Sequence, residues 1–156
     1  MNKFFKTVLL TGLFAGTTDM LSAFLTVYIK SGKFPLKMFH YLAGGALGLD
    51  VSMKGGVAVA FLGLFFHYFI AIAFTLFFFL LFPRVKFLSF NKYLIGTLYA
   101  IFVNQVMDQV ILRLTPLPSG KFDLANAYIG WISFAVVFGI PIAWSAYKYY
   151  GVKEEA

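Results

Sequence analysis

Cysteine is absent from this chain of 156 residues, and charged residues are scarce. Without cysteine the chain forms no disulfide and offers no thiolate for metal binding or catalysis. Only 12% of the residues are charged, whereas 61% are hydrophobic and 21 are phenylalanines. A soluble domain of this length has too little interior to bury so many aromatic rings. The composition therefore predicts an integral membrane protein.

Catalytic motifs are missing as well. The sequence contains no Gly-x-Ser-x-Gly, no His-Glu-x-x-His and no phosphate-binding glycine loop. A haem with two axial histidines would require His40 to reach His67 from a different segment. A metal enzyme needs three or four ligands, and Asp19, His67 and Asp108 are the only intramembrane candidates. We therefore expect no enzymatic activity and no cofactor, and the sequence leaves metal binding undetermined.

Four long apolar stretches follow one another along the chain, at about residues 4–29, 56–82, 93–114 and 125–147. Each has at least the ~20 residues that a helix needs to cross ~30 Å of hydrocarbon. Helices satisfy every backbone amide within their own segment, which the bilayer requires. The short connections predict an all-α, up-and-down bundle of four transmembrane helices, forming a single domain over residues 1–156.

The segment "FPLKMFHYLAGGALGL", residues 34–49, is too short and too polar to span a membrane. On a helix, Lys37, Tyr41, Gly44 and Gly48 would form a stripe that runs from polar to small side chains. This pattern favours a short interfacial or re-entrant helix whose glycines pack against the bundle. A surface loop with some helical content is the alternative.

The basic residues predict the partners and the orientation of the chain. Three of them fall in the ten residues from Pro83 to Lys92, on the same side as both termini. The positive-inside rule then places the termini in the cytoplasm. The net charge of +7 is distributed over both ends of the bundle, which indicates contact with membrane lipids and not with nucleic acid.

Three stretches resemble the YagU-like family of bacterial inner-membrane proteins: "GLFAGTTDMLSAF", "FFHYFIAIAFTLFFFLLFPRVKF" and "GTLYAIFVNQVMDQVILRLTPLP". The resemblance covers about residues 12–118, while residues 34–49 and the fourth span match poorly. It implies a multi-pass protein of the bacterial inner (plasma) membrane with a histidine at the position of His67. It implies no reaction and no ligand.

Polar side chains interrupt three of the four apolar stretches. Counted from the side of the membrane that bears the loop after the first span, Asp19 lies ~15 Å deep, His67 ~17 Å, Asn104 ~15 Å and Asp108 ~9 Å. Asn104 and Asp108 are four residues apart and share a helix face, with Gln105 on the adjoining stripe. An unpaired carboxylate at the centre of a bilayer costs at least ~2.5 kcal/mol. The sequence therefore predicts that these five residues meet in one intramembrane polar site.

Structural roles are the alternative for several of these positions. Gly12 and Gly16 form a GxxxG motif, which predicts close packing of the first helix against a neighbour. Pro141 removes the amide that would bond to the Val137 carbonyl. That free carbonyl could coordinate a cation or a water, or the proline could introduce a kink that improves packing.

Two functions from different classes follow from these residues. In the first, the bundle conducts or exchanges a proton or small solute through the polar site. In the second, it is a non-catalytic accessory subunit, whose polar residues lock helix packing or dock a membrane-protein partner or another copy of the chain.

Overall fold

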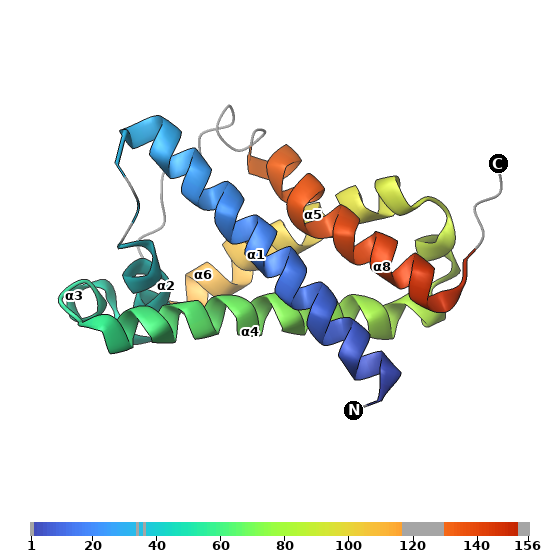
Figure 1. The fold of residues 1–156 in the computed structure, drawn as a ribbon, viewed down its shortest axis with the longest axis horizontal. Helices are drawn as coiled ribbons and strands as arrows, with labels where there is room; N and C mark the ends of the chain where they lie inside the picture. The colour runs from blue at the N-terminus through green and yellow to red at the C-terminus, as the bar shows by residue number, and fades with distance from the viewer. Residues whose placement is uncertain (1, 34, 36, 117–129, 153–156) are drawn as a thin grey trace.

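The computed structural model describes residues 2–33, 35, 37–116 and 130–152 (Figure 1). Within these ranges the chain is helical and contains no strand, which confirms the predicted all-α class. Four helices are long and apolar enough to cross a membrane: Lys3–Ser31, Val57–Arg84, Lys92–Ile111 and Gly130–Tyr150. They agree with the predicted spans to within a few residues, except that the predicted start of the fourth, at residue 125, lies outside the described residues.

The first two spans are single α-helices joined by two short ones. The spans are α1 (Lys3–Ser31) and α4 (Val57–Leu81), and the connection contains α2 (Met38–Leu47) and α3 (Leu49–Ser52). The short helix predicted within residues 34–49 is therefore present, and α2 packs along α4. Two 3₁₀ turns, Phe82–Arg84 and Lys86–Ser89, follow α4.

The third and fourth spans each contain a π-helical turn. The third consists of α5 (Lys92–Val106), a π turn (Met107–Ile111) and α6 (Leu112–Leu114). The fourth contains a π turn (Ala135–Gly139) followed by α8 (Ile140–Tyr150). Because a π turn has one residue more than an α turn, it changes the direction of the side chains that follow.

Glycines set the distances between neighbouring helices. A Cβ on Gly12 would lie 2.9 Å from Ile72 Cα, and one on Gly16 would lie 3.1 Å from Ala71 Cβ. The predicted GxxxG contact is therefore present, and it joins α1 to α4. Gly44 is buried on α2, as predicted.

Gly48 does not have the packing role that the sequence predicted. A Cβ at this position would meet no atom within 4 Å. Its backbone φ of 79° lies in the left-handed region, which glycine adopts without strain, and it separates α2 from α3. The close approach between α2 and α4 occurs at Gly63 instead, where a Cβ would collide with the Phe39 carbonyl.

Aromatic rings fill the end of the bundle that carries the termini. Phe78, Phe79, Phe82, Tyr99 and Tyr147 are all buried there. The Tyr99 hydroxyl donates a hydrogen bond of 2.6 Å to the Phe74 carbonyl, and the Phe78 and Tyr99 ring centroids are 4.6 Å apart. We call these five buried residues the aromatic plug, because they close the bundle at this end.

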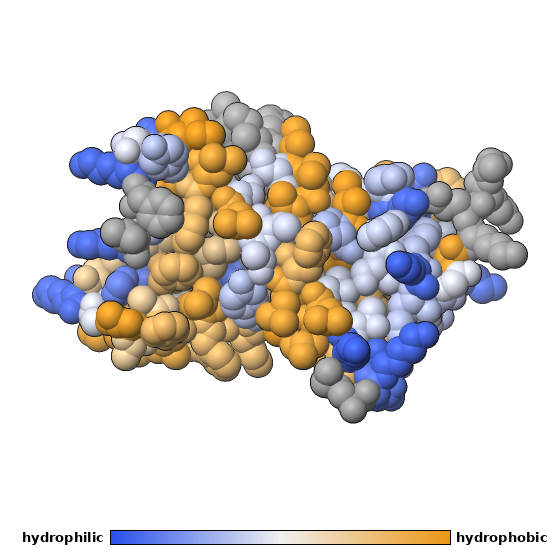
Figure 2. All heavy atoms as spheres, viewed as in Figure 1, coloured by the Kyte–Doolittle hydropathy of each residue, from blue (hydrophilic) through white to orange (hydrophobic). Residues whose placement is uncertain are grey.

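The surface has the distribution expected of a membrane-spanning bundle. Figure 2 shows the strongly hydrophilic residues gathered at the two ends of the molecule, with hydrophobic surface between them. Large apolar side chains such as Phe61, Phe65 and Phe69, at 60–64% exposure, point outward from α4. In a bilayer this surface contacts the hydrocarbon chains of the lipids.

Candidate functional site

A cavity of about 310 Å³ lies inside the bundle, between α1, α2, α4, α5 and the fourth span. Of the described residues that line the cavity, Asp19 is the single acidic one, and none is a lysine or an arginine. The rest of the wall is mainly apolar, and includes Leu42, Ile70, Phe74, Val103, Met107 and Phe138. The cavity is therefore an apolar chamber whose described wall carries one carboxyl group.

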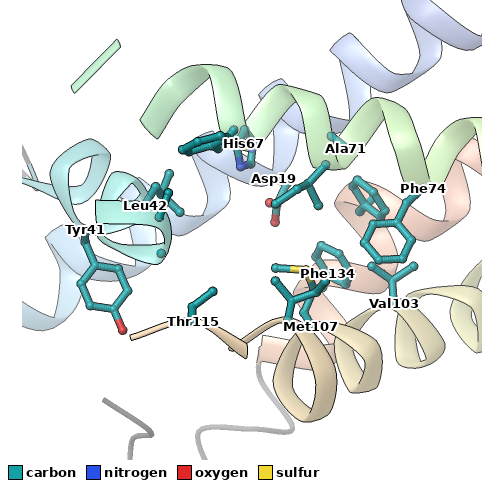
Figure 3. Close-up of a pocket in the computed structure, with 16 residues that line it drawn as sticks. Asp19, Tyr41, Leu42, His67, Ala71, Phe74, Val103, Met107, Thr115 and Phe134 are labelled. Atoms are coloured by element: carbon teal, nitrogen blue, oxygen red, sulfur yellow. The ribbon is translucent and has the colours of Figure 1, made fainter. Parts of the chain in front are cut away.

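The cavity extends from the exposed end near α2 toward the aromatic plug. Figure 3 shows Tyr41 and Thr115 at one end, with Phe74 and Val103 at the other. The Tyr41 side chain is 42% exposed, whereas Val103 is 1% exposed. Phe74 is hydrogen-bonded through its carbonyl to Tyr99 of the plug. The chamber thus runs from exposed residues at the end opposite the termini to buried residues beside the aromatic plug.

Asp19 and His67 meet in this cavity, from α1 and α4 (Figure 3). Both side chains line the same cavity, and no hydrogen bond joins them. His67 Nε2 lies 2.8 Å from the Gly16 carbonyl oxygen. Because a carbonyl only accepts, Nε2 is the ring nitrogen that donates in this bond. The close GxxxG crossing of α1 and α4 brings His67 within hydrogen-bond distance of Gly16. This bond holds the imidazole beside Asp19.

The Asp19 carboxylate receives no hydrogen bond from any residue that the structure describes. Its neighbours Thr17 and Thr18 direct their hydroxyls elsewhere, to Leu13 and Tyr68 and to the fourth span respectively. A role for Asp19 in locking a helix pair would need such a bond, and the described residues provide none. A half-buried carboxylate facing an apolar cavity needs water, a proton or a cation as its partner.

The predicted convergence of Asn104, Gln105 and Asp108 with Asp19 and His67 is not observed. None of these three residues lines the cavity, and Gln105 and Asp108 are exposed on the outside of the third span. The third span turns a different stripe inward, made of the small and apolar residues Gly96, Ala100, Val103 and Met107. A Cβ on Gly96 would lie 2.6 Å from Ile140 Cα, so this stripe fits tightly against the fourth span.

Gln105, Asp108 and Gln109 consequently form a polar surface on the third span, which we call the polar stripe. All three side chains are exposed, although they belong to a segment otherwise suited to hydrocarbon. Amides and carboxylates are unfavourable in contact with lipid. The stripe therefore requires a polar partner or the headgroup region near the end of the span.

Pro141 has the effect on the backbone that the sequence predicted. The Val137 carbonyl accepts a hydrogen bond of 2.6 Å from the Thr18 hydroxyl of α1. The freed carbonyl is therefore satisfied by a neighbouring helix, which supports the packing role of the proline over cation coordination. This bond also anchors the residue next to Asp19 to the fourth span.

Metal ligation by the predicted residues has little support from the geometry. Within the described part of the chain, no three histidine, aspartate or glutamate side chains are close enough to hold one ion. Asp19 and His67 would supply two ligands, while Asp108 lies outside the cavity. His40 lies elsewhere and its Nε2 donates to the Gly55 carbonyl at 3.1 Å.

Several cavity residues were not singled out from the sequence. Tyr41 belongs to the stripe predicted on α2, whereas Met107, Phe134 and Phe138 are apolar residues that polarity alone does not distinguish from lipid-facing ones. The spacing Gly96, Ala100, Val103, Met107 repeats every three or four residues, and this pattern could have identified the inward face of the third span.

No protein-family model, no curated protein and no solved structure matches this chain.

Proposed function

We propose that this protein moves a proton or a small solute across a membrane by way of the Asp19–His67 cavity. The observation that carries this proposal is the Asp19 carboxylate, which faces the apolar chamber and receives no hydrogen bond from a described residue. A carboxylate with a purely structural role is normally hydrogen-bonded when it is withdrawn from water. Intramembrane acidic residues that face a cavity commonly mark proton or ion pathways.

The aromatic plug favours a carrier over an open pore. The cavity is closed beyond Phe74, so a solute that reaches Asp19 has no continuous path to the other side. Passage requires the helices to rearrange and open the plug, as in alternating access. Both π turns contribute side chains to the cavity wall, through Met107 and Phe138, and π turns often occur at functional positions in helices.

We further propose a location in the bacterial inner membrane with cytoplasmic termini. The dense basic loop from Pro83 to Lys92 supports this orientation under the positive-inside rule. The cavity lies toward the opposite end, so it would open to the periplasm in the state that the structure represents. This location also agrees with the resemblance to the YagU-like family.

Proton flux into proteoliposomes tests the proposed function. Vesicles loaded with a pH-sensitive dye, and given a potassium diffusion potential with valinomycin, should acidify faster with the protein than without it. The rate should depend on Asp19, as developed in the Discussion. A flux equal to that of empty vesicles would contradict proton movement through the cavity.

Docking of a partner is the second candidate function, and the polar stripe is the observation that favours it. Gln105 and Gln109 each carry both donors and acceptors, so two copies of the stripe can pair across a two-fold axis. We expect the purified protein to be a dimer in mild detergent, and the Gln105→Leu/Gln109→Leu variant to shift it toward monomer. Mass measured by light scattering checks this. A monomeric wild-type protein, or a dimer unaffected by the substitutions, would contradict pairing through the stripe.

A further inference from the structure

The chemistry of the cavity wall restricts what can occupy it. Apolar side chains line most of the chamber, and one carboxylate, Asp19, supplies its negative charge. A volume of about 310 Å³ exceeds the space needed by a single water or a bare ion. It falls at the small end of the range of cavities that bind organic molecules, which is roughly 300–1,000 Å³.

An inorganic cation fits this wall poorly. Calcium takes six to eight oxygen ligands and magnesium prefers six. Asp19 is the only carboxylate in the described lining, and the Tyr41 and Thr115 hydroxyls lie at the far end of the chamber in Figure 3. The remaining wall offers hydrocarbon in place of the hydration shell that such an ion would lose. A bare metal ion would therefore be under-coordinated.

A neutral apolar molecule also fits poorly, because it would cover the Asp19 carboxylate without compensating its charge. A cation with an apolar body satisfies both parts of the wall. Its charge pairs with Asp19, and its body replaces water against residues such as Ile70 and Met107.

Aromatic rings strengthen this match. Phe66, Phe74, Phe134 and Phe138 all line the cavity, and the Phe134 and Phe138 rings stack with centroids 4.6 Å apart. The faces of aromatic rings attract organic cations, and the attraction increases where water is excluded.

We propose that the Asp19–His67 cavity binds small amphipathic organic cations, with the cationic group against Asp19 and the apolar body among the phenylalanines. The inference rests on the proposed function, because it assigns the class of solute to the same chamber. It adds to that function a specific class of solute, organic cations, in place of a proton alone.

Equilibrium dialysis against nanodiscs containing the full chain tests this assignment. The probe is benzyltrimethylammonium, whose charge is permanent, and the matched neutral compound is neopentylbenzene, in which carbon replaces the nitrogen. Empty nanodiscs correct for partition into lipid. We expect saturable binding of the cation, weakened about tenfold or more by Asp19→Asn and unchanged by Asp108→Asn. The neutral compound should bind Asp19→Asn at least as well as the wild type.

The absence of saturable cation binding to the wild type, or equal binding to Asp19→Asn, would overturn the assignment. A neutral compound weakened as much as the cation would also overturn it, because charge would then have no part in recognition. Melting temperatures of both variants establish that they are folded. Binding is measured without a gradient, so a protein that carries protons but binds no cation contradicts this inference alone. A protein that binds the cation but moves neither it nor protons contradicts only the proposed function.

Discussion

Asp19→Asn is expected to reduce proton flux in proteoliposomes by about tenfold or more, to near the rate of empty vesicles. Asparagine has nearly the shape of aspartate, but it neither binds nor releases a proton near neutral pH. Asp19 is the single carboxylate in the described cavity lining, and the Nε2 of the neighbouring His67 is already used in its bond to Gly16. The substitution should therefore cause a large loss of proton flux without a loss of stability.

The folded state should tolerate this substitution. No described residue donates a hydrogen bond to the Asp19 carboxylate, so the change removes no such contact from the fold. Replacing a charged group within the membrane by a neutral one also removes the penalty of keeping that charge away from water. The melting temperature in detergent should accordingly stay the same or rise.

Asp108→Asn is the matched control, because it makes the same chemical change on an exposed face outside the cavity. Its flux should equal that of the wild type. Equal losses of flux in the two variants would contradict a specific role of Asp19. A fall in flux together with a fall in melting temperature for Asp19→Asn would indicate the structural role of this residue instead.

Gly139→Ala is expected to destabilise the protein by about 1–3 kcal/mol, the range typical of overpacking in a tightly fitted interior. An added Cβ would collide with the Gly96 carbonyl oxygen and lie 2.8 Å from Ala100 Cβ. Gly96 belongs to the backbone of a second helix, so the collision can be relieved only if two transmembrane helices separate. Reversible unfolding in mixed micelles measures the change in free energy.

Gly130→Ala is the control for this prediction, since it adds the same methyl group to the same span. A Cβ on Gly130 would meet nothing within 4 Å. Its free energy of unfolding should stay within about 0.5 kcal/mol of the wild type, as for most surface changes. Equal stability of the Gly139→Ala and Gly130→Ala variants would show that the third and fourth spans do not cross where the structure places them.

The number and length of the spans could be predicted from sequence because hydrophobic length is a property of each segment alone. The contact at Gly12 and Gly16 was predictable for a similar reason, since small residues four apart permit close approach whatever the partner. The Val137 carbonyl freed by Pro141 follows from proline chemistry. Which group would satisfy it, the Thr18 hydroxyl, depends on how α1 and the fourth span pack.

The rotation of the third span could not be predicted from polarity. We expected Asn104 and Asp108 to face inward, since a carboxylate avoids lipid. Rotation depends on packing against neighbours, however, and hydropathy does not specify it. The tight fit of Gly96 against Ile140 turns Val103 and Met107 toward the cavity, and the polar stripe is left outside. Two residues of the predicted site, Asp19 and His67, do lie together. They do so because His67 bonds to Gly16, which is one helical turn before Asp19 on α1.

The central claim is that a cavity accessible to water and cations reaches the middle of the bundle beside Asp19. Cysteine labelling tests it directly, because the chain contains no native cysteine. Ile70 lines the cavity, while the adjacent Phe69 is 60% exposed on the lipid-facing surface of α4. A charged methanethiosulfonate that does not cross membranes is added to intact cells that express Ile70→Cys or Phe69→Cys. We predict that the reagent modifies Ile70→Cys from the periplasmic side and leaves Phe69→Cys unmodified; an inert Ile70→Cys, or faster reaction of Phe69→Cys, would contradict the account.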